Sequence, residues 1–375
     1  MTAETMTVLP AADAAERLDT ASQWQLMRWR FLRHKAAVAS LFVIAFFYIM
    51  AIAVEFVAPY DPNIPNVFYQ YAPPMRIRFL HEGRLHRPFT YDYVQSRDPK
   101  TLRMVFAEDE ERPHPIRFWV KGDSYRFWGL WRGDRHLFGL EDPDARILLL
   151  GTDELGRDML SRVVYGARIS LSIGFIGVIL SLALGVLLGG VSGYFGGTVD
   201  LFIQRMIELL QSLPQIPLWL TLSAALPREW TAIQIYFGIT IVISVVAWTE
   251  IARVVRGRFL ALREEEFVLA ARFLGASETR IIFRHLVPSM TSHLIAVLTL
   301  RIPEMILAET TLSFIGLGLQ APVVSWGVLL ADVQNIRTVA SSPWLFSTGV
   351  CIIVVVLCFN FTGDGLRDAA DPYTH

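Results

Sequence analysis

The stretch FVLAARFLGASETRIIFRHLVPSM, residues 267–290, lies between two hydrophobic segments and guides the interpretation of the whole chain. Its first part, residues 267–274, can form a short helix. Ala270 and Ala271 present almost no side chain on that helix, so a groove of another protein can approach its backbone closely. The residues alone leave two readings open: a docking element for a partner, or a structured linker between two membrane spans.

The second part of the stretch contains residues that end one helix and begin another. Gly275 can end the first helix in a left-handed cap, because glycine adopts positive φ at no steric cost. Ser277 can cap a second helix through ETRIIFRH, and Pro288 interrupts the chain where it re-enters the membrane. The pattern predicts two short helices at an angle, a shape suited to helix-in-groove docking.

The composition indicates a membrane protein. Of 375 residues, 53% are hydrophobic and 12% aromatic, which is too apolar for two or three soluble domains, and the net charge of −1 gives no indication of a nucleic-acid partner. Cys351 and Cys358 are separated by about two helical turns, so we expect neither a disulfide nor a metal site. The sequence contains no phosphate loop, HExxH or GxSxG motif, so we expect no enzyme activity and no cofactor in this chain.

Six apolar stretches are long enough to cross a bilayer, which needs about 20 residues per helix. Three are uninterrupted and three contain polar residues. The six predicted spans are residues 36–58, 169–190, 201–226, 232–252, 291–312 and 344–361.

Positive charge predicts the orientation of these spans. The first span is preceded by Arg28, Arg30, Arg33 and Lys35, which places the N-terminus in the cytoplasm. With six spans, the C-terminus and the loop at 253–290 are then predicted to lie in the cytoplasm as well. The first span is predicted to be an uncleaved anchor rather than a signal peptide. Trp24, Met27 and Phe31 recur at helical spacing among these basic residues, which fits a helix that lies on the inner leaflet. A plain basic flank is the alternative.

A polar segment of about a hundred residues, 59–165, separates the first two spans and is too long for an idle connection. Charged and aromatic residues alternate in it, which predicts short strands with turns at Glu82-Gly83, Gly122-Asp123 and Arg132-Gly133-Asp134. We expect a small β-containing periplasmic domain. Its clustered aromatic residues are predicted to form its core rather than a ligand platform: Phe118, Trp119, Tyr125, Phe127, Trp128 and Trp131.

The predicted organisation therefore has five parts. They are a cytoplasmic amphipathic segment (1–35), a first transmembrane helix (36–58), a periplasmic insert (59–165), a core of five further transmembrane helices (166–362) and a cytoplasmic tail (363–375).

Charged and polar side chains inside the spans are costly in lipid, so they face a bundle interior or water. Arg301 and Glu304 lie one turn apart, and either line a translocation path or neutralise each other. Pro214 and Pro217 predict a kinked third span next to a cavity. Glu208 can pair with Arg205 as a structural or gating pair. The candidates for lining a path are Glu208, Gln211, Gln215, Arg301, Glu304 and Glu309.

Three stretches, in order, resemble the membrane subunits of the oligopeptide/dipeptide/nickel branch of ATP-binding-cassette (ABC) importers. They are LGTDELGRDMLSRVVYGARIS (150–170), the opening stretch, and LAETTLSFIGLGLQAPVVSWGVLL (307–330), followed by GDGLRDAADP near the end of the chain. The opening stretch resembles the EAA loop of that family. Leu269 replaces its glutamate and His285 its isoleucine, so the role of the glutamate does not carry over. The long insert is similar to that of the microcin/peptide subgroup.

The resemblance implies the type I ABC importer permease fold: an all-α membrane protein of six transmembrane helices plus the small β-containing insert. It implies that the loop couples the permease to the ATPases, through Leu269, Ala270, Ala271, Gly275, Ala276, Ser277, Arg284, His285 and Pro288.

The resemblance also implies the setting of the chain. It would be the second, C-type permease subunit in the bacterial inner membrane. Its partners would be a homologous permease, two ATPase subunits that bind ATP and Mg²⁺, a periplasmic substrate-binding protein and lipid. The implied cargo is an oligopeptide or dipeptide; an oligosaccharide, nickel or a peptide antibiotic is an alternative. An ion-coupled secondary transporter would show inverted repeats, and a membrane-anchored receptor would not need six spans.

Overall fold

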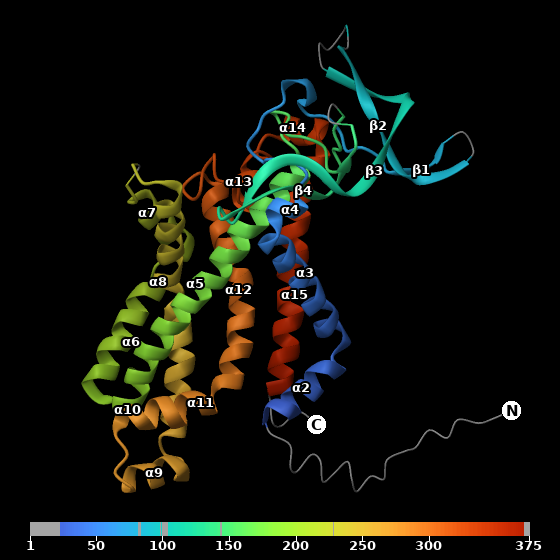
Figure 1. Ribbon diagram of the computed structural model, residues 1–375. Coiled ribbons are helices and arrows are strands. Elements are labelled where there is room, and N and C mark those ends of the chain that lie inside the picture. Colours follow the sequence, from blue (N-terminus) through green and yellow to red (C-terminus); the bar gives the residue numbers. More distant parts are fainter. Residues whose placement is uncertain are drawn as a thin grey trace, which may run out of the picture.

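The computed structural model describes residues 23–370, apart from residues 82–83, 98, 100–103, 143–144 and 228. Long helices form a bundle that carries a sheet at one end and the short helices α9 to α11 at the other (Figure 1). In the described part of the chain, five helical segments are long and apolar enough to cross a membrane: Lys35–Ile52 (α3), Met159–Phe195 (α5), Ala232–Leu262 (α8), Thr291–Phe314 (α12) and Pro343–Ala370 (η3 with α15).

The predicted third span, 201–226, is not one helix. Two helices occupy it: α6 (Gly197–Ser212) and α7 (Gln215–Ala224). Leu213 between them is extended (φ −88°, ψ 136°), because the residue before a proline avoids the helical region, and Pro214 then stands at the N-cap of α7. Pro217 falls in the first turn of α7, where a missing N–H donor is harmless. The prolines therefore break this segment rather than kink it.

The main hydrophobic core lies between α3, α5, α8, α12 and α15. Trp326 of α13 (Trp326–Ala331) is fully buried in it, and its indole N–H donates to the Val163 carbonyl at 3.0 Å. Helices α5 and α8 approach closely through small residues: a Cβ added to Gly189 would stand 2.8 Å from the Ala252 Cα. These two helices therefore form one closely packed pair.

The insert contains a sheet, as predicted, but its strands are longer than expected. All neighbours are antiparallel in the order β1 (Arg78–His81), β2 (Arg84–Arg97), β3 (Met104–Phe127) and β4 (Trp131–Leu140). The prediction of turns at Gly122-Asp123 and Arg132-Gly133-Asp134 is wrong. The first pair lies inside β3, at an irregularity in its pairing with β4, and the second group lies inside β4. An isolated glycine in a strand marks such a bulge as readily as a turn. The predicted turn at Glu82-Gly83 falls outside the described residues.

The prediction of an aromatic core in the insert is also wrong. Phe118, Trp119, Trp128 and Trp131 are exposed, because no second layer among the described residues covers the hairpin of β3 and β4. Only Tyr125 and Phe127 of the six are partly buried. The buried apolar side chains of this region lie elsewhere: Ala72, Met75, Phe89, Tyr91, Leu140, Ala145, Ile147 and Leu148.

Both described ends of the chain pack together. Helix α2 (Gln23–Arg33) places Met27 and Phe31 against Ala37 and Ala369, so these apolar side chains contact the protein rather than a leaflet. Helix α15 (Ser347–Ala370) continues into the predicted tail, 363–375. Residues 1–22 and 371–375 fall outside the described part.

The remaining helices are short. They are α4 (Val54–Val57), η1 (Val67–Tyr69), α9 (Glu266–Phe273), α10 (Glu278–Ile281), the π-helical turn η2 (Ile282–Leu286), α11 (Val287–Ser289), α14 (Ile336–Ser341) and η3 (Pro343–Phe346).

Candidate functional site

The loop between α8 and α12 has the predicted helix, cap and second helix. Helix α9 ends in a Schellman motif: the Ala276 N–H donates to the Ala271 carbonyl at 3.1 Å, and the Gly275 N–H donates to the Arg272 carbonyl at 3.0 Å. Gly275 has φ +77°, the left-handed conformation that glycine adopts freely. The turn is therefore fixed by one residue and by two hydrogen bonds within the loop.

The second half of the loop returns the chain to the membrane. Ser277 caps α10, where its hydroxyl accepts from the Arg280 N–H at 3.4 Å. The helix then widens into the π-turn η2 before α11. Pro288 stands in the first turn of α11, where it needs no donor, and α12 begins three residues later at Thr291.

The inner face of the loop packs on the ends of the long helices. Val268, Ile281 and Leu286 are buried in one cluster with Phe259 of α8 and Tyr194 of α5. The guanidinium of Arg272 also lies over the Tyr194 ring, 5.7 Å from its centroid. The loop is therefore packed closely onto the ends of α5 and α8.

The outer face of the loop is exposed and apolar at its tip. Phe273 is 90% exposed and Leu274 is 88% exposed, directly before the Gly275 cap. Two large apolar side chains held rigidly in water are typical of a surface that binds another protein. Sequence reasoning missed both; the apolar pair next to the glycine was the available signal. The other predicted loop residues differ in exposure: Leu269, Ala271, Ala276 and His285 are half-buried, and Ala270, Ser277, Arg284 and Pro288 are exposed.

A second group of predicted residues forms an ion-pair network between α8 and α12. One guanidinium nitrogen of Arg301 lies 2.5 Å from a Glu304 carboxylate oxygen, and another pairs with Glu250 of α8. Arg301 is 24% exposed, Glu250 39% and Glu304 60%. Pairing of Arg301 with Glu304 was one of the two readings that the sequence left open, and Glu250 is a partner that the sequence analysis did not identify.

Glu309 lies apart from that network and has no exposed surface. Its carboxylate accepts hydrogen bonds from the hydroxyls of Ser170 (2.9 Å), Ser313 (2.8 Å) and Ser325 (2.7 Å). These serines belong to α5, α12 and the N-cap of α13. The carboxylate thus holds three segments together, because each hydroxyl would otherwise lack its acceptor.

The remaining path candidates lie on α6 and α7. Glu208 pairs with Arg205 at 2.7 Å, and both are exposed in the single chain. The Gln211 amide donates to the Thr249 hydroxyl of α8 at 3.1 Å, which is a helix-to-helix hydrogen bond. Gln215 is exposed at the start of α7.

One further link was not predicted. Asp200 of α6 binds Arg256 of α8 through both carboxylate oxygens, each contact being 2.6 Å. This bidentate pair is a strong and directional interaction, and it ties α6 to the helix that carries the loop. Among the described residues, none of the acidic, histidine and cysteine side chains form a group of three that could hold a metal ion.

The sequence matches two family models. Residues 185–374 match the binding-protein-dependent transport system inner membrane component, and residues 22–74 match the N-terminal transmembrane domain of oligopeptide transport permease C.

Relatives extend this similarity over nearly the whole chain. The oligopeptide transport system permease protein OppC of Haemophilus influenzae is 34% identical over 357 residues, which is 95% of this chain and 90% of the relative. OppC of Bacillus subtilis is 37% identical over 63% of this chain and 75% of the relative, and the dipeptide transport system permease protein DppC of the same organism is 41% identical over 59% and 68%. These relatives are transport permeases rather than enzymes. The chain therefore belongs to the family of inner membrane components of binding-protein-dependent transport systems, the permease subunits of ABC importers.

Proposed function

We propose that this chain is the C-type permease subunit of a bacterial importer for oligopeptides or dipeptides, and that its α9–α10 loop couples the transport path to ATPase subunits. The rigid loop with Phe273 and Leu274 exposed at its tip is the observation that carries this proposal. The peptide cargo is supported by the names of the oligopeptide and dipeptide permeases to which the chain is similar.

The mechanism follows from how the loop is joined to the helices. An ATPase that grips the tip moves the buried cluster around Val268, and with it α5 and α8. The Asp200–Arg256 pair carries that motion to α6, and the Arg301–Glu250 pair carries it to α12. The helices then rock between states that open to either side of the membrane, and this chain transmits force without cutting bonds.

The complete transporter requires other subunits. We propose a homologous second permease, two ATPases that bind ATP and Mg²⁺ on the loop side, and a periplasmic protein that delivers substrate on the insert side. The loop, α2 and the end of α15 lie at the same end of the bundle, opposite the insert (Figure 1). This arrangement supports an inner-membrane topology with both termini in the cytoplasm.

Path-lining residues are proposed on the exposed polar surface. Glu208, Gln215, Arg301 and Glu304 all retain exposed surface that a second permease and a cargo can share. For Glu309 we propose a structural role instead, because its three hydroxyl partners leave it no contact with a path in this conformation.

Affinity purification tests the coupling proposal. A complex captured through a tag on this chain should contain two copies of ATP-binding-cassette subunits. Phe273→Glu with Leu274→Glu should remove those subunits while leaving the chain in the membrane, because two charges at the tip oppose burial in an apolar groove. Leu85→Glu, an exposed apolar site in the insert, is the matched control and should retain them. Equal ATPase recovery from both variants would overturn the assignment.

Reconstitution with the companion binding protein tests the cargo. Peptides should stimulate ATP hydrolysis in the complete complex, and oligosaccharides or nickel should not. Stimulation by one of those solutes, and not by peptides, would show that the importer carries that solute instead.

A further inference from the structure

The hairpin at residues 118–138, formed by the second half of β3 and by β4, carries an unusual exposed surface. We refer to it as the aromatic hairpin. Its apolar side chains stand open in the described chain: Phe118 (68% exposed), Trp119 (63%), Trp128 (51%), Leu130 (73%) and Trp131 (66%). So many large apolar groups in water are unfavourable, which indicates that another phase or partner covers them.

Contacts with the first span fix the height of the hairpin. The indole N–H of Trp128 donates to the Ile52 carbonyl at 3.0 Å, and its backbone N–H donates to Glu55 at 3.2 Å. Ile52 ends α3, which starts at Lys35 and is 18 residues long. That length corresponds to ~27 Å, about the thickness of the hydrocarbon core. Trp128 therefore stands at the outer boundary of the hydrocarbon.

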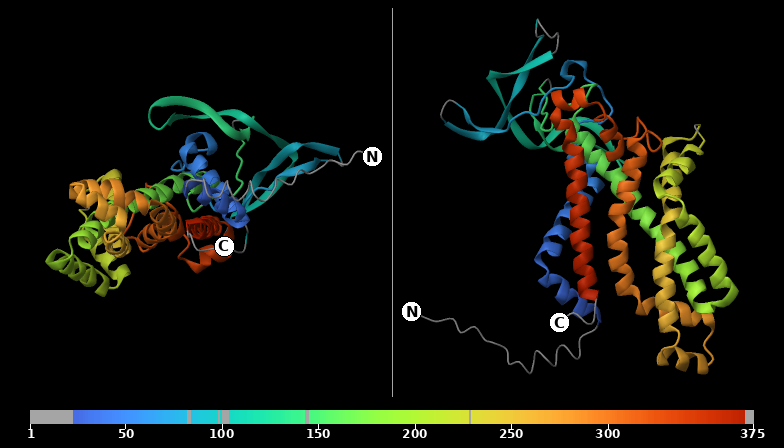
Figure 2. Two further views of the ribbon diagram at one scale, coloured as in Figure 1. Left: turned by 90° about the horizontal axis from the view of Figure 1, so that it is seen from below. Right: turned by 180° about the vertical axis from the view of Figure 1, so that it is seen from behind.

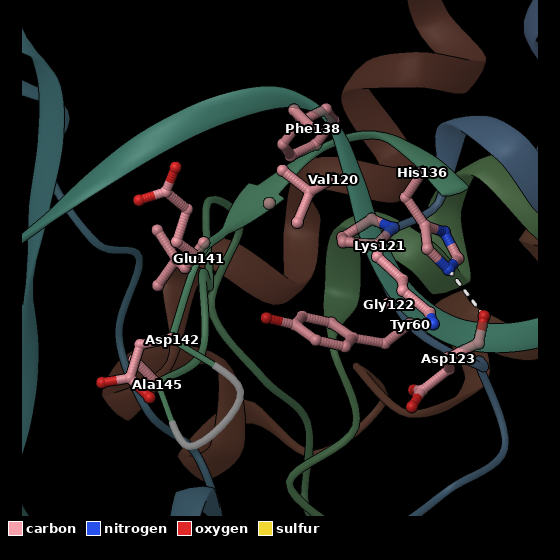
Figure 3. A pocket seen from close by; sticks show the side chains of 13 residues that line it. Tyr60, Val120, Lys121, Gly122, Asp123, His136, Phe138, Glu141, Asp142 and Ala145 are labelled. Atoms are coloured by element: carbon pink, nitrogen blue, oxygen red, sulfur yellow. Dashed lines mark hydrogen bonds between the residues drawn. The ribbon is translucent and has the colours of Figure 1, made fainter. Parts of the chain in front are cut away.

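Further contacts hold the hairpin at this height. The guanidinium of Arg168 lies over the Trp128 ring at 4.4 Å, and the Trp119 ring lies 5.0 Å from that of Phe56. Within the hairpin, one ring nitrogen of His136 lies 2.6 Å from the Ala58 carbonyl and the other lies 3.0 Å from the Asp123 carbonyl. This ring stands at the edge of a cavity of about 350 Å³ (Figure 3). These contacts attach the aromatic hairpin to the membrane-spanning part of the chain.

The surface of the hairpin continues an exposed apolar stripe on the first span. Along α3 the exposed apolar residues recur every three or four positions, at Phe42, Phe46, Ile49 and Ile52. The stripe ends at the residue whose carbonyl binds Trp128. Seen along the helices, the hairpin arches out beside the bundle rather than over it (Figure 2, left).

We propose that the aromatic hairpin lies in the headgroup layer of the bilayer, on the side opposite the α9–α10 loop. Tryptophan suits that layer because its ring is apolar and its N–H is polar. The partner is lipid. Anionic headgroups fit the excess of positive charge, since Lys121, Arg126, Arg132 and Arg135 outnumber Asp123 and Asp134 and opposite charges attract. This inference goes beyond transport, because it assigns a lipid-binding surface to the insert and is independent of the cargo.

Site-directed spin labelling of the complete complex in vesicles of phosphatidylethanolamine and phosphatidylglycerol tests the proposal. A nitroxide is placed at Leu130→Cys or Phe118→Cys in a background with Cys351→Ala and Cys358→Ala. Leu85→Cys, 83% exposed on β2, is the matched control. The probes are molecular oxygen, which collects in the acyl region, and a polar nickel chelate, which stays in water.

The oxygen-to-nickel collision ratio at residues 130 and 118 should exceed that at residue 85. It should lie between the values of nitroxides attached to lipid headgroups and to acyl chains. A ratio equal to that at residue 85 would place the hairpin in water and overturn the proposal. Suppressed collision with both probes would overturn it equally, because the hairpin would then be covered by a protein partner.

Discussion

Gly275 offers the sharpest test of the coupling loop, because only its backbone conformation constrains it. A Cβ added there would meet no atom within 4 Å, but φ is +77°. Any other residue at this position therefore lowers the stability of the capped loop by about 1–2 kcal/mol, because of left-handed backbone strain alone. That amount lowers the population of the capped loop by roughly 5–30-fold relative to other conformations.

A small series of variants separates strain from bulk. Gly275→Ala and Gly275→Leu should both reduce ATPase recovery and transport, while Gly275→Asn should fall between them and the wild type, because asparagine tolerates this region better. Gly257→Ala is the matched control: Gly257 lies inside α8, has no positive φ and has no atom near an added Cβ. That change should be neutral, or stabilising by ~0.5–1 kcal/mol.

The assay is substrate-stimulated ATP hydrolysis and uptake by the purified complex in vesicles, with membrane insertion checked for each variant. Wild-type uptake and ATP turnover by Gly275→Leu would refute the coupling role. Equal damage from Gly275→Ala and Gly257→Ala would refute the argument from φ.

Three further predictions concern the membrane region and its outer edge. Glu309→Leu should destabilise the chain by about 3 kcal/mol or more, because three buried hydroxyls lose their acceptor, whereas Glu309→Gln should destabilise it by about 1 kcal/mol. Thermal unfolding in detergent measures both variants, and equal melting temperatures for the two would contradict the hydrogen-bond network. Arg301→Leu should impair assembly of the complex. Adding Glu250→Leu should restore more of the assembly than adding Glu304→Leu, because Glu250 is the less exposed partner. Size-exclusion profiles of the two double variants show which one assembles better. Burial raises the pKa of Asp158, the N-cap of α5, to about 6, so the folded state favours the protonated acid. Protonated Asp158 therefore contributes ~3 kcal/mol to the free energy of unfolding below pH 4, and this contribution is lost as the pH rises to 6. Asp158→Asn should remove that pH dependence of the melting temperature, and an unchanged dependence would show that another group causes it.

The local features of the loop could be predicted from the sequence, because short-range chemistry determines them. Gly275 and Ser277 act on backbone groups a few residues away, so the cap and the start of α10 follow from residue type and order. Spans such as α3 and α15 follow from the length of apolar runs.

Features that depend on distant residues could not be predicted. Nothing near Arg301 in the sequence identifies Glu250 as its partner, because the pairing depends on how α8 lies beside α12. Gly122 gives the same local signal for a bulge as for a turn, and the long partner strand decides between them. Trp119 is exposed because no second layer covers the hairpin in the described part of the chain, and a pattern of alternating aromatic residues does not reveal this.

Photo-crosslinking from the tip of the loop tests the central claim most directly. A benzophenone amino acid replaces Phe273, which is 90% exposed, and the complex is irradiated in native membranes with and without ATP. Mass spectrometry should identify an ATP-binding-cassette subunit as the crosslinked partner, with a yield that changes when ATP is added. Crosslinks to lipid or to a periplasmic protein, with no ATPase among the products, would contradict the account.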